Sequence, residues 1–181
     1  MNIVLDTNAL LMAISAKNIY HRVWLAFLSG KYTLCITNEI IEEYLEVISR
    51  NINPLVAEKI VSAILTRENT IKLDPHFRFQ LIETDQDDNK FADCAIAGNA
   101  SYIVTEDHHF DILKDLKFPP LSVIGIDEFI YIITGWGIDL DYCDIEWFAL
   151  EMHRDHSVAF EIASKLRKRS LNAKLFRRVQ D

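Results

Sequence analysis

The sequence predicts an α/β protein, a three-layer α/β/α sandwich around a central parallel sheet of about five strands. Short, almost wholly apolar runs of strand length alternate with amphipathic runs of helix length, which is typical of a parallel sheet covered on both faces. Half of the 181 residues are hydrophobic, enough for a sizeable core. Right-handed crossovers between such strands favour the three-layer arrangement.

Each element follows from this alternation. The expected strands are the short apolar runs Ile3–Leu5, Leu34–Ile36, Ile71–Leu73, Tyr102–Val104 and Leu121–Ile126. The expected helices are the amphipathic runs Tyr20–Leu28, Glu39–Ile48, Val56–Leu65, Phe91–Ala100 and Phe110–Leu113, followed by one that begins near Asp127. The acids at the start of this last segment suit a helix N-terminus.

A change in composition divides the chain. Residues 134–144 hold two of the five glycines, and we place a boundary there. The prediction is a domain over residues 1–134 and a helical C-terminal extension over residues 135–181.

The extension ends in a basic tail. Residues 165–178 carry seven basic side chains and no acidic one, although the formal net charge is −8. Basic side chains that contact phosphates give salt-dependent affinity for nucleic acid, so the tail is a candidate RNA-binding segment. Contact with the acidic body and a solvated helix face are the other interpretations. The candidate RNA-binding residues are Lys165, Arg167, Lys168, Arg169, Lys174, Arg177 and Arg178.

Composition also bears on the compartment. The sequence has no apolar run long enough to cross a bilayer, and its first residues lack the features of a signal peptide. The three cysteines are scattered without CxxC spacing, which favours free thiols in a reducing environment. We therefore expect a cytoplasmic protein without membrane contact.

Acids follow two of the predicted strands. Asp6 comes directly after the first strand, and Asp107 lies just past the fourth, in "YIVTED". Sites in such sheets form beyond the carboxyl ends of the strands, near a reversal of strand order. We therefore expect these two carboxylates to lie close together.

Two helices supply further acids to the same edge. In "TNEIIEEYLEVISR" Glu43 alone of four glutamates borders the apolar arc of the helix. In "DQDDNKFADCAIAGNA" Asp88 falls near the middle of the buried face and Asp93 nearer its edge. Asp85 and Asp87 are interpreted as loop or cap residues. Asp88 is the preferred site residue here and Asp93 the reserve.

A set of carboxylates at one place requires a cation or protons, because the like charges repel. An all-oxygen donor set suits Mg²⁺ or Mn²⁺ rather than zinc. A divalent ion held in this way activates water and stabilises charge on a phosphate. Phosphodiester hydrolysis is the chemistry that this pattern indicates.

Three stretches, "IVLDTNALL", "CITNEIIEEYLEVI" and "DDNKFADCAIAGNASYIVTEDHHF", resemble the PIN domain family in order and spacing. The likeness is greatest to the branch of toxin components of toxin–antitoxin pairs, and it covers roughly residues 1–134. It implies an α/β/α sandwich and a Mg²⁺- or Mn²⁺-dependent ribonuclease with three or four acids in its site. It also implies an RNA substrate, an antitoxin protein as a possible partner, and a homodimer.

By position, the resemblance assigns the catalytic acids to Asp6, Glu43, Asp88 and Asp107. Asp6, Asp88 and Asp107 are expected to hold the metal, and Asp93 occupies a second position that is often acidic in this branch. The extension from about residue 135 departs from the minimal family pattern and leaves the substrate and partner open.

Four polar residues lie beside these acids. Asn8 and Thr105 match family positions that orient the acids, in agreement with amide and hydroxyl groups that hold metal ligands in place. His108 and His109 in "EDHHF" suggest a general acid, although adjacent histidines at a helix start are more often surface residues.

Two other classes of function stay open at this point. A PIN-like module that binds RNA or protein without cutting it would keep the acids in a weak or silent site. A haloacid dehalogenase-like phosphatase also has an Asp after its first strand, but it requires a second acid two residues later, where this chain has Asn8.

Overall fold

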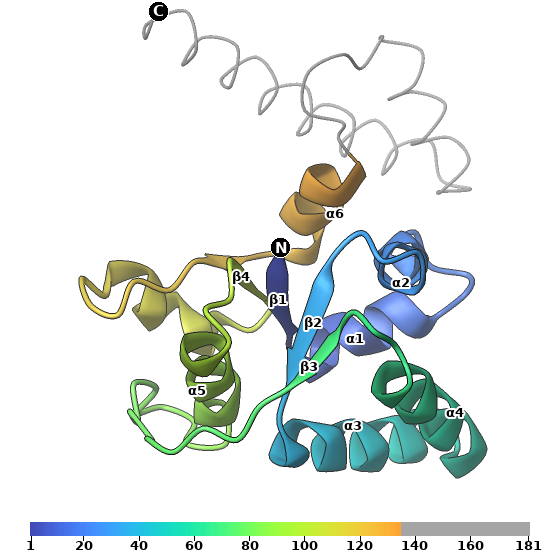
Figure 1. The fold of residues 1–181 in the computed structure, drawn as a ribbon, viewed down its shortest axis with the longest axis horizontal. Helices are drawn as coiled ribbons and strands as arrows, with labels where there is room; N and C mark the ends of the chain where they lie inside the picture. The colour runs from blue at the N-terminus through green and yellow to red at the C-terminus, as the bar shows by residue number, and fades with distance from the viewer. Residues whose placement is uncertain (135–181) are drawn as a thin grey trace, which may run out of the picture. The chain divides into compact units, whose positions relative to one another are not determined.

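The computed structural model describes residues 1–134 as a five-stranded sheet with helices on both sides (Figure 1). The strands are β1 Asn2–Leu5, β2 Thr33–Ile36, β3 Thr70–Lys72, β4 Tyr102–Val104 and β5 Val123–Ile124. The helices are α1 Thr7–Ile14, α2 His21–Leu28, α3 Asn38–Asn51, α4 Pro54–Leu65, α5 Asn89–Ala97, the 3-10 helix η1 His108–Asp115 and α6 Ile126–Thr134. Residues 135–181 lie outside the described residues, so the extension, its boundary and its basic tail stay predictions.

All four strand pairs in the sheet are parallel, in the order β3-β2-β1-β4-β5. The central strand β1 pairs through Ile3 with Leu34 of β2 and with Tyr102 of β4. The chain builds outward from β1 to β3, then crosses back to place β4 on the other side of β1. The predicted fold class is confirmed, and the strand order reverses between β1 and β4.

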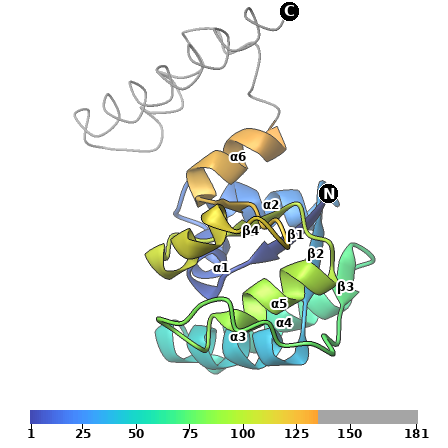
Figure 2. The ribbon, with the colours of Figure 1, turned by 90° about the vertical axis from the view of Figure 1, so that its left-hand side faces the viewer.

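Helices cover both faces of the sheet. Helix α5 lies on one side, and α1 and α2 lie on the other (Figures 1 and 2). The β1 residues Ile3, Val4 and Leu5 are buried between these layers. On the α5 side Phe91 packs edge-to-face on Phe110 of η1, with ring centroids 6.2 Å apart. The core thus fixes α5 and η1 against the strands whose ends carry the acids.

The structure differs from the sequence-based expectations in three elements. Helix α1 was not among the expected helices; it starts directly after Asp6, whose carboxylate accepts the Thr7 N–H. The segment after Asp107 is a 3-10 helix. Strand β5 is shorter than expected because α6 already begins at Ile126, where the Glu106 carboxylate accepts the backbone N–H.

A search of residues 1–134 for a helix long and apolar enough to span a bilayer finds none.

Candidate metal centre

Asp6 and Thr105 lie next to each other because the strands that precede them are paired. Leu5 of β1 is in register with Val104 of β4, and the Asp6 N–H donates to the Val104 carbonyl at 3.0 Å. The Thr105 hydroxyl donates to Asp6 Oδ2 at 2.6 Å, and the Thr7 N–H donates to Asp6 Oδ1 at 2.6 Å. The carboxylate of Asp6 is therefore held in one orientation at the point where the strand order reverses.

Thr105 also holds the neighbouring groups. Its Oγ1 accepts the Asp107 N–H at 2.9 Å and lies 3.4 Å from the Asn8 side-chain nitrogen, which donates to it. The Asn8 side-chain oxygen in turn accepts the Glu106 N–H at 3.3 Å. Asn8 and Thr105 thus join the chain just after β1 to the chain just after β4, and the orienting role that the resemblance implies for them stays a prediction.

Burial makes the charged form of Asp6 costly. Its pKa is raised from 3.8 to about 6, first by desolvation, while the bonds from Thr105 and Thr7 act in the opposite direction. The nearby charges of Asp88 and Glu43 raise this pKa further. A buried carboxylate under these conditions is stabilised by a nearby cation.

Helix α3 brings Glu43 to the same place. The Thr7 hydroxyl donates to Glu43 Oε1 at 2.5 Å, and the Lys90 ammonium lies 2.6 Å from Oε2. Both partners of this ion pair are largely covered, with 15% of the Lys90 side chain and 25% of the Glu43 side chain exposed. The sequence argument did not identify Lys90, the second residue of α5, although it directly precedes the buried residue Phe91.

Asp88 occupies the position before α5 but makes no capping hydrogen bond with its side chain. Its Oδ2 is buried and has no hydrogen-bond partner among the described residues. Its pKa is raised to about 6, mainly by burial and then by the charges of Asp85 and Asp107, whereas His109 acts to lower it. A buried carboxylate oxygen without a hydrogen-bond partner is a suitable position for a cation ligand.

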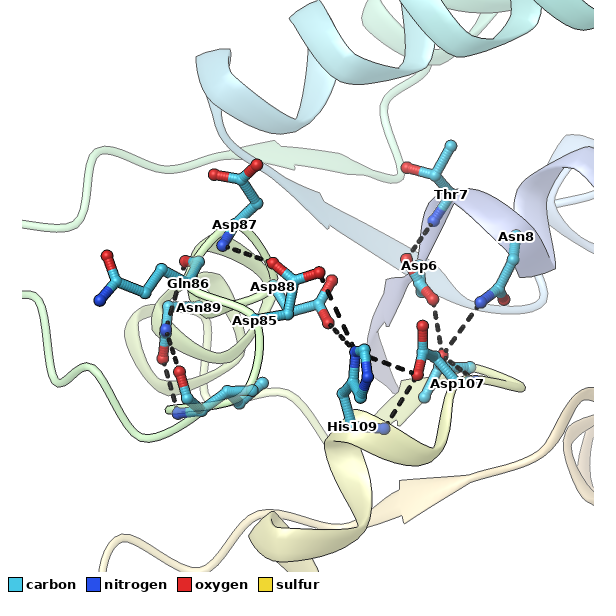
Figure 3. Close-up of polar contacts among 12 residues, drawn as sticks. Asp6, Thr7, Asn8, Asp85, Gln86, Asp87, Asp88, Asn89, Asp107 and His109 are labelled. Atoms are coloured by element: carbon cyan, nitrogen blue, oxygen red, sulfur yellow. Dashed lines mark hydrogen bonds and ion pairs between the residues drawn. The ribbon is translucent and has the colours of Figure 1, made fainter.

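Asp85 and His109 belong to the same cluster, which the sequence argument missed. The imidazole of His109 lies between Asp85 and Asp88 on one side and Asp107 on the other (Figure 3). His109 Nδ1 is 3.5 Å from Asp88 Oδ2, 3.5 Å from Asp107 Oδ1 and 4.0 Å from Asp85 Oδ2. The three-residue spacing of Asp85 and Asp88 was the available signal for Asp85. His109 was considered from the sequence only as a possible general acid, because its partners Asp85 and Asp88 come from another part of the chain.

His108 and Asp87 lie differently from their neighbours. The side chain of His108 is 94% exposed and pairs with Asp111, as expected for a surface residue. The carboxylate of Asp87 points away from His109 (Figure 3). Each therefore provides a matched control for the residue beside it.

Asp93 is engaged elsewhere. Its Oδ1 accepts the Phe79 N–H at 3.0 Å, and the charged side chains that act on it are Arg78 and Glu39. Burial raises its pKa. Asp93 thus secures the loop between β3 and α5, and we rank it below Asp88 as the third acid.

The donor set fits a divalent cation. Acids from four parts of the chain, Asp6, Glu43, Asp88 and Asp107, meet at the reversal of strand order, and two of them have pKa values near 6. Carboxylate oxygens of this kind are typical ligands of Mg²⁺ and Mn²⁺. The buried, unpartnered Asp88 Oδ2 is the observation that favours an ion here over a purely structural cluster.

Known protein families include one that matches most of the described domain. A family model for the PIN domain matches residues 2–109. No curated protein was found that matches the chain. Among solved structures, that of VapBC2 from Rickettsia felis bound to a DNA fragment from their promoter is similar, with a TM-score of 0.49 and 21% sequence identity. That similarity covers 69% of this chain and 98% of the other.

Proposed function

This chain belongs to the PIN domain family, and from that premise we propose that it is a Mg²⁺- or Mn²⁺-dependent endoribonuclease that hydrolyses RNA phosphodiester bonds. The observation that carries the proposal is the orphaned Oδ2 of Asp88, buried in a cluster of acids at the carboxyl ends of β1 and β4. Nucleases of this family use such acids to hold divalent ions.

The proposed roles follow from the contacts. Asp6, Asp88 and Asp107 would hold the ion, with Asp93 as the weaker candidate because it already accepts the Phe79 N–H. When bound, a divalent ion lowers the pKa of a coordinated water and stabilises negative charge on a phosphate.

The remaining polar residues would position this machinery. Thr105 fixes the rotamer of Asp6 and the backbone of Asp107 through two hydrogen bonds. Glu43 would add negative charge beside Asp6, and the ion pair with Lys90 would partly neutralise that charge.

We further propose that the protein is the toxin component of a toxin–antitoxin pair, acts in the cytoplasm and forms a homodimer. The order of the motifs, which resembles the toxin branch, supports this role. Induced expression of the full chain in a bacterial host should arrest growth, and Asp6→Asn should relieve the arrest. Light scattering of the purified protein measures whether it dimerises.

The basic tail is proposed to bind RNA backbone. If its seven basic residues contact phosphates, the slope of RNA affinity against salt concentration should become shallower when all seven are replaced by Gln. An unchanged slope would dismiss this role and leave the nuclease proposal intact.

The decisive experiment is cleavage of a mixed panel of structured and single-stranded RNAs. The full chain is assayed with Mg²⁺, with Mn²⁺ and with EDTA, beside Asp6→Asn and Asp107→Asn. Asp87→Asn is the matched control, because its carboxylate points away from the cluster (Figure 3). Cleavage that requires the metal, persists in the control and disappears in the two site variants is the expected result. Full activity of both site variants would contradict the proposal.

One observation favours a second candidate, a PIN-like module that binds RNA or protein without cutting. The side chains of Lys90 and His109 already face Glu43 and Asp88. In a silent site such groups would take the place of a metal ion beside the acids. Mn²⁺ binding without cleavage of any RNA would select this alternative. Membership in the PIN family removes the reason to consider a haloacid dehalogenase-like phosphatase.

A further inference from the structure

The proposed ribonuclease site is made of carboxylates, and an imidazole nitrogen, Nδ1 of His109, faces three of the acids around it. His109 is the second residue of η1, and its backbone N–H donates to Asp107 Oδ1 at 2.9 Å, which fixes the position of the residue. Its side chain is 46% exposed, and Nδ1 is directed at the carboxylates of Asp85, Asp88 and Asp107. The imidazole therefore lies at the rim of the cluster with one nitrogen directed inward.

The ligand atoms of the cluster lie close enough together for small side-chain movements to bring them onto one ion. The ligand atoms of Asp85, Asp88 and His109 all lie within 4.8 Å of one another. The distances of 3.5 and 4.0 Å from Nδ1 to the Asp88 and Asp85 oxygens exceed those of hydrogen bonds. Around one divalent ion, adjacent ligand atoms lie about 3 Å apart and opposite ones about 4 Å apart.

The carboxylates of Asp85 and Asp88 differ in their hydrogen bonding. Asp85 Oδ1 accepts the Asp87 N–H at 3.0 Å, so the hydrogen bond orients this carboxylate and leaves Oδ2 toward the imidazole. Asp88 Oδ2 is buried without a hydrogen-bond partner among the described residues and faces the same nitrogen. Two oxygens and one nitrogen thus converge from the loop before α5 and from η1 (Figure 3).

We infer that Asp85, Asp88 and His109 form a nitrogen-containing site for a divalent transition-metal ion, which makes this protein selective for Mn²⁺ over Mg²⁺. Imidazole is a poor ligand for Mg²⁺, which prefers oxygen and retains its water, but a good one for first-row transition ions. The inference rests on the proposed function for the presence of a divalent ion at this edge of the sheet. It adds two ligands, Asp85 and His109, that the carboxylate site does not require.

The test reads the metal's ligands directly. Mn²⁺ is bound to the full chain, and electron spin-echo envelope modulation measures ¹⁴N coupling to the ion. The coupling is expected in the wild type and in His108→Gln, the exposed neighbour, and should disappear in His109→Gln. Circular dichroism checks that the variants are folded, and the exposed position of His109 and the retained backbone bond to Asp107 make this the expected outcome.

A second readout measures selectivity. Competition between Mn²⁺ and Mg²⁺ should show that His109→Gln and Asp85→Asn weaken Mn²⁺ binding by roughly tenfold or more, the range seen when groups that support a metal site are removed. Mg²⁺ binding should change much less in His109→Gln. Asp111→Asn, which removes an exposed acid that pairs with His108 and Lys114, should leave both affinities unchanged.

The outcomes separate this inference from the nuclease proposal. Bound Mn²⁺ without ¹⁴N coupling, or coupling that persists in His109→Gln, overturns the inference, and His109 is then an ion-pair partner of the acids. RNA cleavage by the same protein would leave the nuclease proposal standing in that case. If the ¹⁴N coupling depends on His109 but the protein cleaves no RNA, the metal site is supported and the nuclease proposal is contradicted. Absence of any Mn²⁺ binding overturns the inference, and absence of both Mn²⁺ and Mg²⁺ binding overturns both proposals.

Discussion

The Thr105 hydroxyl donates a 2.6 Å hydrogen bond to the Asp6 carboxylate across 99 residues of sequence. The same oxygen accepts the Asp107 N–H at 2.9 Å. One side chain therefore orients the Asp6 carboxylate and fixes the backbone of Asp107. We therefore propose that Thr105 positions the ligands of the proposed metal site without having to contact the ion itself.

Replacing Thr105 by Val keeps the shape of the side chain but removes the hydroxyl. We expect Mn²⁺ affinity and RNA cleavage to fall by roughly 10- to 100-fold, as for other groups that orient metal ligands. Thr105→Ser, which keeps the hydroxyl, should retain most of both. Titration with Mn²⁺ and the RNA cleavage assay measure the two effects, and equal activity of the Val and Ser variants would remove Thr105 from the site.

The metal-free protein should lose stability as the pH rises from 4 to about 6. In the folded state the pKa of Asp6 is raised to about 6 by burial and by the charges of Asp88 and Glu43, against 3.8 without the fold. The folded state therefore binds more protons in this window, and the free energy of unfolding falls as pH rises through it. One pH unit between the two pKa values corresponds to about 1.4 kcal/mol, so Asp6 contributes about 2–3 kcal/mol to this change.

Urea denaturation in EDTA between pH 4 and 8 measures this dependence. Asp6→Asn should flatten the dependence of the free energy of unfolding on pH. The dependence that remains should come from Asp88, whose pKa is also raised to about 6. The control variant Asp87→Asn should follow the wild-type curve. A slope in Asp6→Asn as steep as that of the wild type would show that Asp6 is not a source of the effect.

The ion pair between Lys90 and Glu43 should contribute measurable stability. Because only 15% and 25% of the two side chains are exposed, removal of one partner leaves the other poorly solvated. A double-mutant cycle with Lys90→Met and Glu43→Gln should give a coupling energy of about 1–2 kcal/mol.

The exposed pair Arg50 and Glu46 on α3, with 68% of each side chain exposed, is the comparison. Its coupling energy should stay below about 0.5 kcal/mol. Equal coupling in the two pairs would mean that the Lys90 pair is solvated in solution. In the Lys90→Met variant, added Mn²⁺ should recover part of the lost stability, since an ion would then replace the missing positive charge.

Gly98 at the end of α5 should not tolerate a side chain. A Cβ there would lie 2.8 Å from Cys35 Sγ and 2.8 Å from Leu73 Cδ1. Cys35 is fully buried, so Gly98→Ala should destabilise the protein by about 1–3 kcal/mol through overpacking. Ala97→Ser at the exposed neighbouring position should change stability by less than about 0.5 kcal/mol. Thermal melts of the two variants distinguish these results, and equal melting temperatures would contradict the prediction.

The class of fold was predictable because it depends on local pattern. A wholly apolar strand such as Ile3–Leu5 is buried on both faces, so it lies between two layers of helices. The alternation of strands with helices indicates parallel pairing. That pattern does not fix element ends. Helix α1 was missed because Asp6, which caps the start of this helix, was interpreted as a candidate site residue. The short run after it does not distinguish the two roles.

The sequence alone determined the fold class, the PIN-like motifs and which acids follow which strands, since these depend on residue order and periodicity. Only the tertiary structure decided that Asp85 and His109 join Asp88, that Lys90 faces Glu43, and that Asp93 is bonded to the loop at Phe79. The physical reason is that each of these relationships includes a contact between separate segments of the chain. Its energy depends on distances between side chains from separate elements, and periodicity along one element carries no information about such distances.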